Sequence, residues 1–226
     1  MDFTKKGAVK AQKELVSKLP RNRRKLNISV FKIILVLVLA IVIVGVGAGF
    51  GALKGILDDT PNINADALIP KGYKTTLVYQ NGKEITTLAN SNSNREYVYY
   101  DSIPEDLVNA FVAIEDRRFW EHNGIDVQGI ARAFIKGLKS GDFDEGASTL
   151  TQQLIKNNVF NVGLNESTFL DKLERKVQEQ YLAVDMEKKI DKKSIVEYYL
   201  NTIYLGEGCY GVETAAKTYF GKGLSQ

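Results

Sequence analysis

The sequence predicts a mainly α-helical protein with one helix that spans a membrane. Three observations support this. A stretch of 21 residues, Ile33–Leu53, carries no charged side chain. Apolar residues recur at helical spacing from Pro104 onward, and the clearest β pattern is one hairpin at residues 75–88. With 44% apolar and 25% charged residues, the composition is typical of globular proteins, which excludes disorder for most of the chain.

Basic residues crowd the first 32 positions. Ten lysines or arginines stand there against Asp2 and Glu14, although the formal net charge of the whole chain is only +3. The run RNRRK at 21–25 is one pattern for nucleic-acid binding. Because a long apolar stretch follows it, we interpret the run as the flank of a membrane helix and predict no nucleic-acid partner.

Residues 33–53 have the length of a membrane-spanning helix. They lie between Lys32 and Lys54, and about 20 apolar residues cross a bilayer. A cleaved signal peptide is the alternative interpretation, but its apolar part is about 7 to 15 residues long. The positive-inside rule puts residues 1–32 in the cytoplasm and the chain after Lys54 outside. We therefore predict a single-pass protein of the cell membrane with an extracellular domain.

The chain is predicted to consist of a basic tail, a membrane helix, a linker with a small β element, and a helical domain, at residues 1–32, 33–53, 54–103 and 104–226. In the linker, two β-prone runs, Thr75–Gln80 and Lys83–Leu88, flank Asn81-Gly82. That dipeptide predicts a hairpin with a type I′ turn. Residues Tyr97–Tyr99 predict another short strand.

Cap signals divide the helical domain. Pro104 fits the first position of one helix. Asp126 fits the cap of a second helix that ends at Gly141. The other predicted N-caps are Ser148 or Thr149 for one helix, Ser167 for the next, and Asp191 or Ser194 for a third. Gly221 is the predicted C-cap of the last helix.

Cysteine and histidine, the residue types most often used in metal sites, occur once each. Cys209 is the one cysteine, so an intrachain disulfide and a cysteine-based metal site are excluded. His122 is the one histidine, which argues against a histidine-rich zinc site and against a Ser-His-Asp triad with a spare histidine.

Four segments of the helical domain resemble a known family. They read EDRRFWEHNGID at 115–126, GASTLTQQ at 146–153, RKVQE at 175–179 and IVEYYLNTIYLGEGCYGVETAAKTYFGK at 195–222. In this order they resemble the signature motifs of the peptidoglycan glycosyltransferases, glycosyltransferase family 51, found in class A penicillin-binding proteins and monofunctional transglycosylases. The resemblance covers about residues 73–222 and implies a lysozyme-like fold with two lobes and a cleft between them.

The resemblance also implies an activity. Family members polymerise lipid II into β-1,4-linked glycan strands, with inversion and release of undecaprenyl pyrophosphate. Their partners are lipid II, the growing strand, the bacterial cytoplasmic membrane and cell-wall synthesis proteins. A lysozyme-like hydrolase and a non-catalytic, membrane-tethered scaffold that binds the wall are the alternatives. We assign no transpeptidase motif to the chain, and because family members continue with further helices, we expect it to be truncated.

By resemblance, Glu115 is the general base and Glu179 the second important glutamate, near the pyrophosphate with basic side chains or a divalent cation, Mg or Mn. We expect Glu115 to be partly desolvated among Ile114, Phe119 and Trp120. The implied substrate-binding residues are Asp116, Ser148, Thr149, Gln152, Gln153, Lys156, Asn157, Arg175 and Lys176.

Plainer interpretations stand beside these roles. Glu115 could be a solvated acid, and Arg175–Glu179 a surface ion pair. GASTLTQQ offers backbone N–H groups and the hydroxyls of Ser148, Thr149 and Thr151 to phosphate oxygens, but it could also be a simple helix cap. His122 is implied to be structural. Arg117 and Arg118 face either pyrophosphate or solvent. Further positions carried over from the family are Glu197, Asn201, Tyr204 and Gly206.

One predicted helix has a face that is both apolar and basic. Ile130, Phe134 and Leu138 recur at four-residue spacing, with Arg132, Lys136 and Lys139 beside them. The pattern fits a membrane surface or a core-facing helix with a solvated basic edge. The implied substrate favours the membrane, because lipid II keeps its pyrophosphate at headgroup level.

Overall fold

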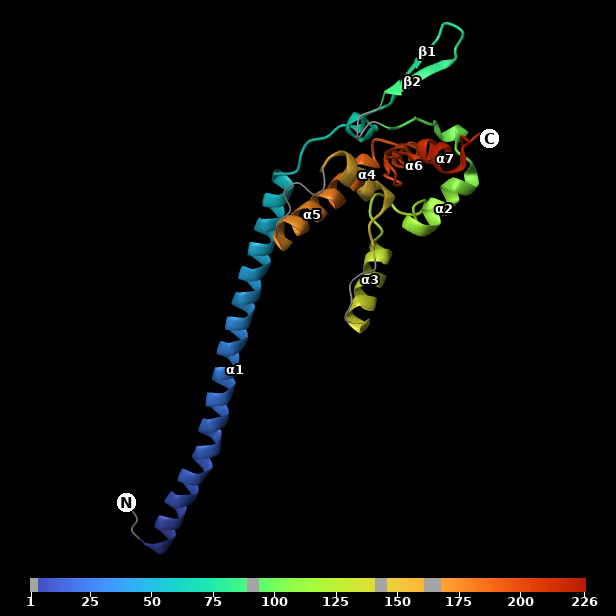
Figure 1. The fold of residues 1–226 in the computed structure, drawn as a ribbon. Coiled ribbons are helices and arrows are strands. Elements are labelled where there is room, and N and C mark those ends of the chain that lie inside the picture. The colour runs from blue at the N-terminus through green and yellow to red at the C-terminus, as the bar shows by residue number, and fades with distance from the viewer. Residues whose placement is uncertain (1–3, 89–93, 141–145, 161–167) are drawn as a thin grey trace. The chain divides into compact units, whose positions relative to one another are not determined.

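The computed structural model describes residues 4–88, 94–140, 146–160 and 168–226, without the side chains of 16–27. It is mostly helical, with one two-stranded sheet, which confirms the predicted fold class (Figure 1). The chain forms two compact units, Met1–Asp58 and Asp59–Gln226.

The first unit is the single helix α1, Lys5–Asp58. Its part from Ile28 to Asp58 is long and apolar enough to cross a membrane, and this part extends beyond the predicted span at both ends. A Ser-x-x-Lys spacing, the signature of penicillin-sensitive transpeptidases, does occur in the sequence, at Ser29–Lys32. It lies within α1, where the part that is long and apolar enough to cross a membrane begins.

The hairpin of the second unit consists of β1, Thr75–Val78, and β2, Glu84–Leu88, paired antiparallel. The predicted type I′ turn is wrong, because Gly82 has a positive φ of 80° and Asn81 does not. Instead, the turn begins earlier, and Gly82 donates from its backbone to Tyr79 O at 2.8 Å. A shift of register between Leu77 and Val78 accommodates the longer loop.

The strand predicted at Tyr97–Tyr99 is also wrong. This segment is extended, but its partners are side chains of α6, Lys192–Thr202. The amide of Asn201 bonds both the N–H and the C=O of Val98, each at 2.8 Å. Glu197 accepts the backbone N–H of Tyr100 at 2.6 Å. Glu197 and Asn201 therefore clamp the incoming chain to α6 in place of a neighbouring strand.

The remaining helices are α2, Glu105–Glu115; α3, Val127–Ser140; α4, Leu150–Asn158; α5, Phe169–Met186; and α7, Val212–Phe220. Two short 3-10 turns, Ala65–Leu68 and Tyr100–Ser102, complete the unit. The loop between α6 and α7 contains Tyr204, which is exposed, and Gly206, which has a positive φ of 87°.

The cap predictions can be compared with these bounds. Asp126 accepts from Gly129 N at 2.8 Å, Asp191 accepts from Ser194 N at 2.8 Å, and Gly221 has a left-handed φ of 69°. Pro104 is the N-cap of α2 and not its first residue. Thr168 caps α5, while Ser167 and Gly141 fall outside the described residues.

The core lies between α4, α5 and α6. Their inward side chains are fully buried, among them Leu150, Leu154, Ile155, Ala183, Ile195 and Leu200. By contrast, α3 stands apart from the other helices of the unit (Figure 1), and its two buried residues are both glycines. The core thus supports the start of α4 firmly, and α4 leads directly to the site.

Candidate active site

The site lies where α2 ends and α4 begins. Glu115 is the last residue of α2. Among the described residues, two adjoining pockets of about 490 and 440 Å³ share Glu115 together with Ile114, Gly146 and Ser148. The first, which we call the arginine pocket, is lined by Arg117, Arg118 and Arg132. The second, the lysine pocket, is lined by Lys156, Arg175 and Lys176. Glu115 therefore stands on the wall common to both.

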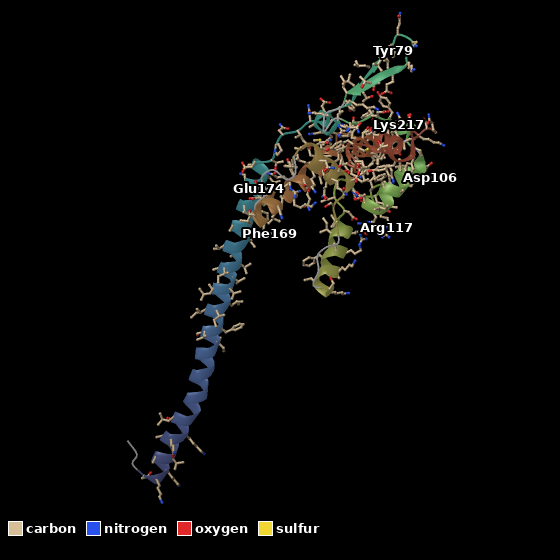
Figure 2. The ribbon with its side chains drawn as sticks, in the orientation of Figure 1. Tyr79, Asp106, Arg117, Phe169, Glu174 and Lys217 are labelled. Carbon is tan, nitrogen blue, oxygen red and sulfur yellow. The ribbon has the colours of Figure 1, made fainter. Side chains whose placement is uncertain are left out.

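The arginine pocket is formed by the end of α2, the loop after it and the first half of α3. Arg118 pairs with Asp126, the cap of α3, and its Nε lies 3.1 Å from Asp126 Oδ2. Arg117 is exposed, and Figure 2 labels it between α2 and α3. In the described part of the chain Arg117 forms no ion pair, so its charge is available to an anionic ligand.

The lysine pocket gathers most of the predicted side chains. It is lined by Glu115, Ser148, Gln152, Gln153, Lys156, Asn157, Arg175, Lys176 and Glu179. Its three cations exceed its two carboxylates, and Lys156 has no carboxylate partner within the described ranges. Such an excess of positive charge suits a phosphate group.

Asp116, predicted to support the site, has its carboxylate fully engaged in holding the structure. It is buried, lies 3.0 Å from His122 Nε2 and accepts the backbone N–H of Leu150 at 3.0 Å. One side chain thus joins the loop after α2 to the first residue of α4. Asp116 lines the arginine pocket, but its contacts fix the wall, and His122 takes part in the same connection.

Thr149 also lines the arginine pocket while acting as a helix cap. Its hydroxyl accepts from Gln152 N, the Gln152 side chain accepts from Thr149 N, and the hydroxyl donates to Gly124 O at 2.7 Å. Gly124 has a φ of 86°, and a Cβ there would lie 2.6 Å from the backbone of Ala183. Only glycine fits this contact between the loop and α5.

Glu115 itself is exposed to solvent. The desolvation expected from Ile114 and Trp120 is not found, because both are exposed, Ile114 to 81%; only Phe119 is buried. Phe119 faces the core instead, where the Lys192 ammonium lies 4.1 Å from its ring centroid. Gln153 Nε2 donates to Glu115 Oε2 at 2.9 Å, and this hydrogen bond links α4 to the end of α2.

Glu179 differs from Glu115 in being completely buried. Arg175 Nη1 pairs with Oε1, and Lys176 Nζ lies 3.1 Å from Oε2 and 2.6 Å from Ser148 Oγ. The Arg175–Glu179 pair is therefore centred on a buried carboxylate and is not a surface ion pair. Because a cation already faces each carboxylate oxygen, this arrangement does not fit a divalent metal ion on Glu179.

Two features escaped the sequence analysis. Tyr199 of α6 was not predicted as a site residue, yet its hydroxyl lies 3.3 Å from Gln153 Oε1. Thr151, expected to offer its hydroxyl to phosphate, is fully buried and donates to Glu187 Oε1 at 2.5 Å. Helical spacing could place both residues on inward faces, but it could not name partners that lie on other helices.

Comparison with known proteins gives a consistent result. Residues 81–226 match the model of the family described as transglycosylase. The chain is 47% identical over 174 residues to penicillin-binding protein 1A of Clostridium novyi, covering 75% of this chain and 20% of that protein. It is 53% identical over 128 residues to penicillin-binding protein 1A of Aquifex aeolicus, covering 57% and 17%. A third relative is penicillin-binding protein 1A/1B of Bacillus subtilis, 38% identical over 166 residues, covering 74% and 17%. The chain thus spans about a fifth of the length of these relatives.

Proposed function

The chain belongs to the transglycosylase family, and from this premise we propose that it is a peptidoglycan glycosyltransferase that polymerises lipid II during bacterial cell-wall synthesis. The observation that carries the proposal is the place of Glu115, on the wall between a pocket rich in arginine and one rich in lysine. A polymerising enzyme must hold two sugars, and each is linked to a lipid through pyrophosphate. Two adjoining pockets that each contain basic side chains and share the Glu115 carboxylate suit this need.

In the proposed reaction, Glu115 takes the proton of the 4-hydroxyl of the acceptor sugar while that oxygen attacks the anomeric carbon of the donor. The new glycosidic bond forms as the bond from the anomeric carbon to the pyrophosphate oxygen breaks, with inversion. Undecaprenyl pyrophosphate leaves with the bonding electrons. Lys156, Arg175 and Lys176 stabilise the charge that develops on it.

Glu179 is assigned to holding these cations and not to proton transfer. Its burial and its contacts with Arg175 and Lys176 keep both side chains at the wall of the lysine pocket. We assign to them the charge balance that a divalent cation would otherwise supply. Polymerisation is therefore expected to continue in the presence of a chelator.

The proposal extends to the membrane. α1 supplies a span of sufficient length, and the basic residues before it support a cytoplasmic tail and a catalytic domain outside, by the positive-inside rule. On α3, Phe134 and Leu138 are 57% and 64% exposed. These side chains, with Lys136 and Lys139 on the same helix, suit an interface with lipid headgroups, where lipid II presents its pyrophosphate. The growing strand and cell-wall synthesis proteins remain the proposed further partners.

The rival functions are separated by one assay. Labelled lipid II and pre-made glycan are incubated with the full chain in detergent or lipid. A polymerase lengthens chains, a lysozyme-like hydrolase shortens the pre-made glycan, and a wall-binding scaffold changes neither. The lysine pocket favours the polymerase, because a hydrolase has no pyrophosphate to hold.

Glu115→Gln is the variant that tests the mechanism. Loss of the proton acceptor should lower the polymerisation rate by about 10²–10⁴-fold without changing thermal stability, because the side chain is exposed. Glu121→Gln is the matched control, since Glu121 is exposed in the same loop and lines neither pocket. If Glu115→Gln polymerises at a rate near that of the wild type, Glu115 is not the general base.

A further inference from the structure

An exposed base needs something to hold it in place. Glu115 ends α2, and its neighbour Ile114 is exposed to 81%, so packing does little to fix the carboxylate. Its hydrogen bond comes from a different helix, where Gln153 Nε2 donates to Oε2 at 2.9 Å. The orientation of the Gln153 amide therefore decides how Glu115 is held.

The Gln153 amide has a second partner, on α6. The hydroxyl of Tyr199 donates to Gln153 Oε1 at 3.3 Å. With Oε1 receiving this proton, Nε2 is the atom turned to Glu115. The reversed amide would set a carbonyl oxygen against the carboxylate and an N–H₂ against the hydroxyl. Because a hydroxyl can donate or accept, the amide orientation is set by the Glu115 carboxylate, which can only accept, and the Tyr199 hydroxyl holds the amide in place by donating to Oε1.

Tyr199 is in turn fixed by the core. It is 3% exposed, and its ring packs edge-to-face on Phe111 with centroids 6.3 Å apart. Burial, followed by the charge of Glu115, raises the pKa of the Tyr199 hydroxyl above its usual value. The hydroxyl therefore stays protonated, as a donor must.

We propose that Tyr199 is a positioning residue for glycosyl transfer: acting through Gln153, it holds Glu115 with Oε2 occupied and Oε1 left to take the proton of the acceptor hydroxyl. Within the described part of the chain, Oε1 accepts no hydrogen bond, which agrees with this division of the two oxygens. The inference rests on the proposed function and adds to it a buried residue that lines neither pocket.

The test is Tyr199→Phe in the full chain, assayed with labelled lipid II. Removing one supporting hydrogen bond, worth about 1 kcal/mol, should lower kcat about fivefold. KM should stay within about twofold, because Tyr199 touches no substrate, and the ring that fills the core is retained. Tyr198→Phe is the matched control, since it removes the same hydroxyl from the adjacent position, about 100° around the helix, and should leave kcat unchanged.

A second variant separates positioning from packing. If Tyr199 acts through Gln153, then Tyr199→Phe should cause no further loss of kcat in a Gln153→Ala background. A fivefold loss in that background, a wild-type kcat for Tyr199→Phe, or an effect confined to KM would each overturn the assignment. If the wild-type chain polymerises lipid II and Tyr199→Phe does so equally well, only the role of Tyr199 is refuted. A wild-type chain that does not polymerise removes the proposed function, and this inference with it.

Discussion

The helices α3 and α4 follow one another in the chain and line adjoining pockets, α3 the arginine pocket and α4 the lysine pocket, yet they place their apolar residues in opposite ways. α4 buries Leu150, Leu154 and Ile155 completely. α3 exposes Phe134, Ile135 and Leu138 by more than half, and its buried residues are glycines. One helix is part of the core, whereas the other has its bulky apolar side chains in contact with solvent.

The difference shows that an apolar helical face does not by itself identify the core. Both helices have apolar residues at helical spacing. What separates them is their anchorage, since α4 is tied at its first residue to Asp116 and by its capping box to the loop of Gly124. α3 is held at its start by Asp126, which caps the helix and lies close to Gly129. A bilayer surface would cover the face that the protein leaves open.

The largest effect on stability is expected in α4. Leu154→Ala should lower the free energy of unfolding by about 2–5 kcal/mol, because it removes a fully buried side chain and leaves a cavity. Ile135→Ala on α3 is the counterpart and should change it by less than about 0.5 kcal/mol. Denaturant unfolding of both variants measures the contrast. Equal losses would mean that α3 is as much a part of the core as α4.

The next effect belongs to α3 and concerns membrane binding. In a chain lacking the membrane helix, residues 59–226, Phe134→Ser with Leu138→Ser should weaken binding to anionic liposomes about tenfold or more, since two apolar side chains no longer leave water. Activity on full-length lipid II should fall as well. The unfolding free energy should change by less than about 1 kcal/mol. Severe destabilisation with liposome binding retained would show that this face is covered by protein.

The smallest expected effect concerns how the stability of the second unit changes as the pH falls. α3 contributes no carboxylate to this change. Burial acts to raise the pKa of Glu96, but hydrogen bonds from Lys217 and Lys74 outweigh it, and the pKa is lowered from 4.5. Glu96 therefore stabilises the fold above about pH 4.5, and this stabilisation is lost as the pH falls through the lowered value. Glu96→Gln should remove a few tenths of a kcal/mol at neutral pH. The variant should also show a smaller loss of stability between about pH 5 and 3 than the wild type. Thermal unfolding at a series of pH values measures this difference. An unchanged slope would mean that the ion pair contributes nothing.

Local sequence signals predicted much of this fold. The long apolar helix follows from its uncharged run, and Asp126, Thr149 and Asp191 cap helices where their side chains reach the free N–H groups. Features that depend on distant partners were not predicted. The extended segment at Tyr97–Tyr99 has strand-like residues, but it pairs with side chains of Asn201 and Glu197 on α6.

The site shows the same limit. The motifs placed eleven predicted side chains around two adjoining pockets, but not the environment of each one. Glu115 was expected among apolar neighbours and is exposed, whereas Glu179 is buried with two cations. Burial at the end of a helix depends on which residues of the following loop turn inward, and here Phe119 does so while Trp120 does not.

The contacts of Asp116 determine which segments must be kept together if this site is built into another protein. Because one carboxylate anchors both the loop of His122 and the first residue of α4, the segments 115–126 and 146–153 form a single transferable unit. Grafting the first onto a new scaffold without the second would leave a buried negative charge with half its partners missing. The graft would also need a backbone surface like that at Ala183 for Gly124 to lie against. The smallest transferable form of the site therefore contains both segments, with the end of α2 and the start of α4, and a backbone surface like that at Ala183.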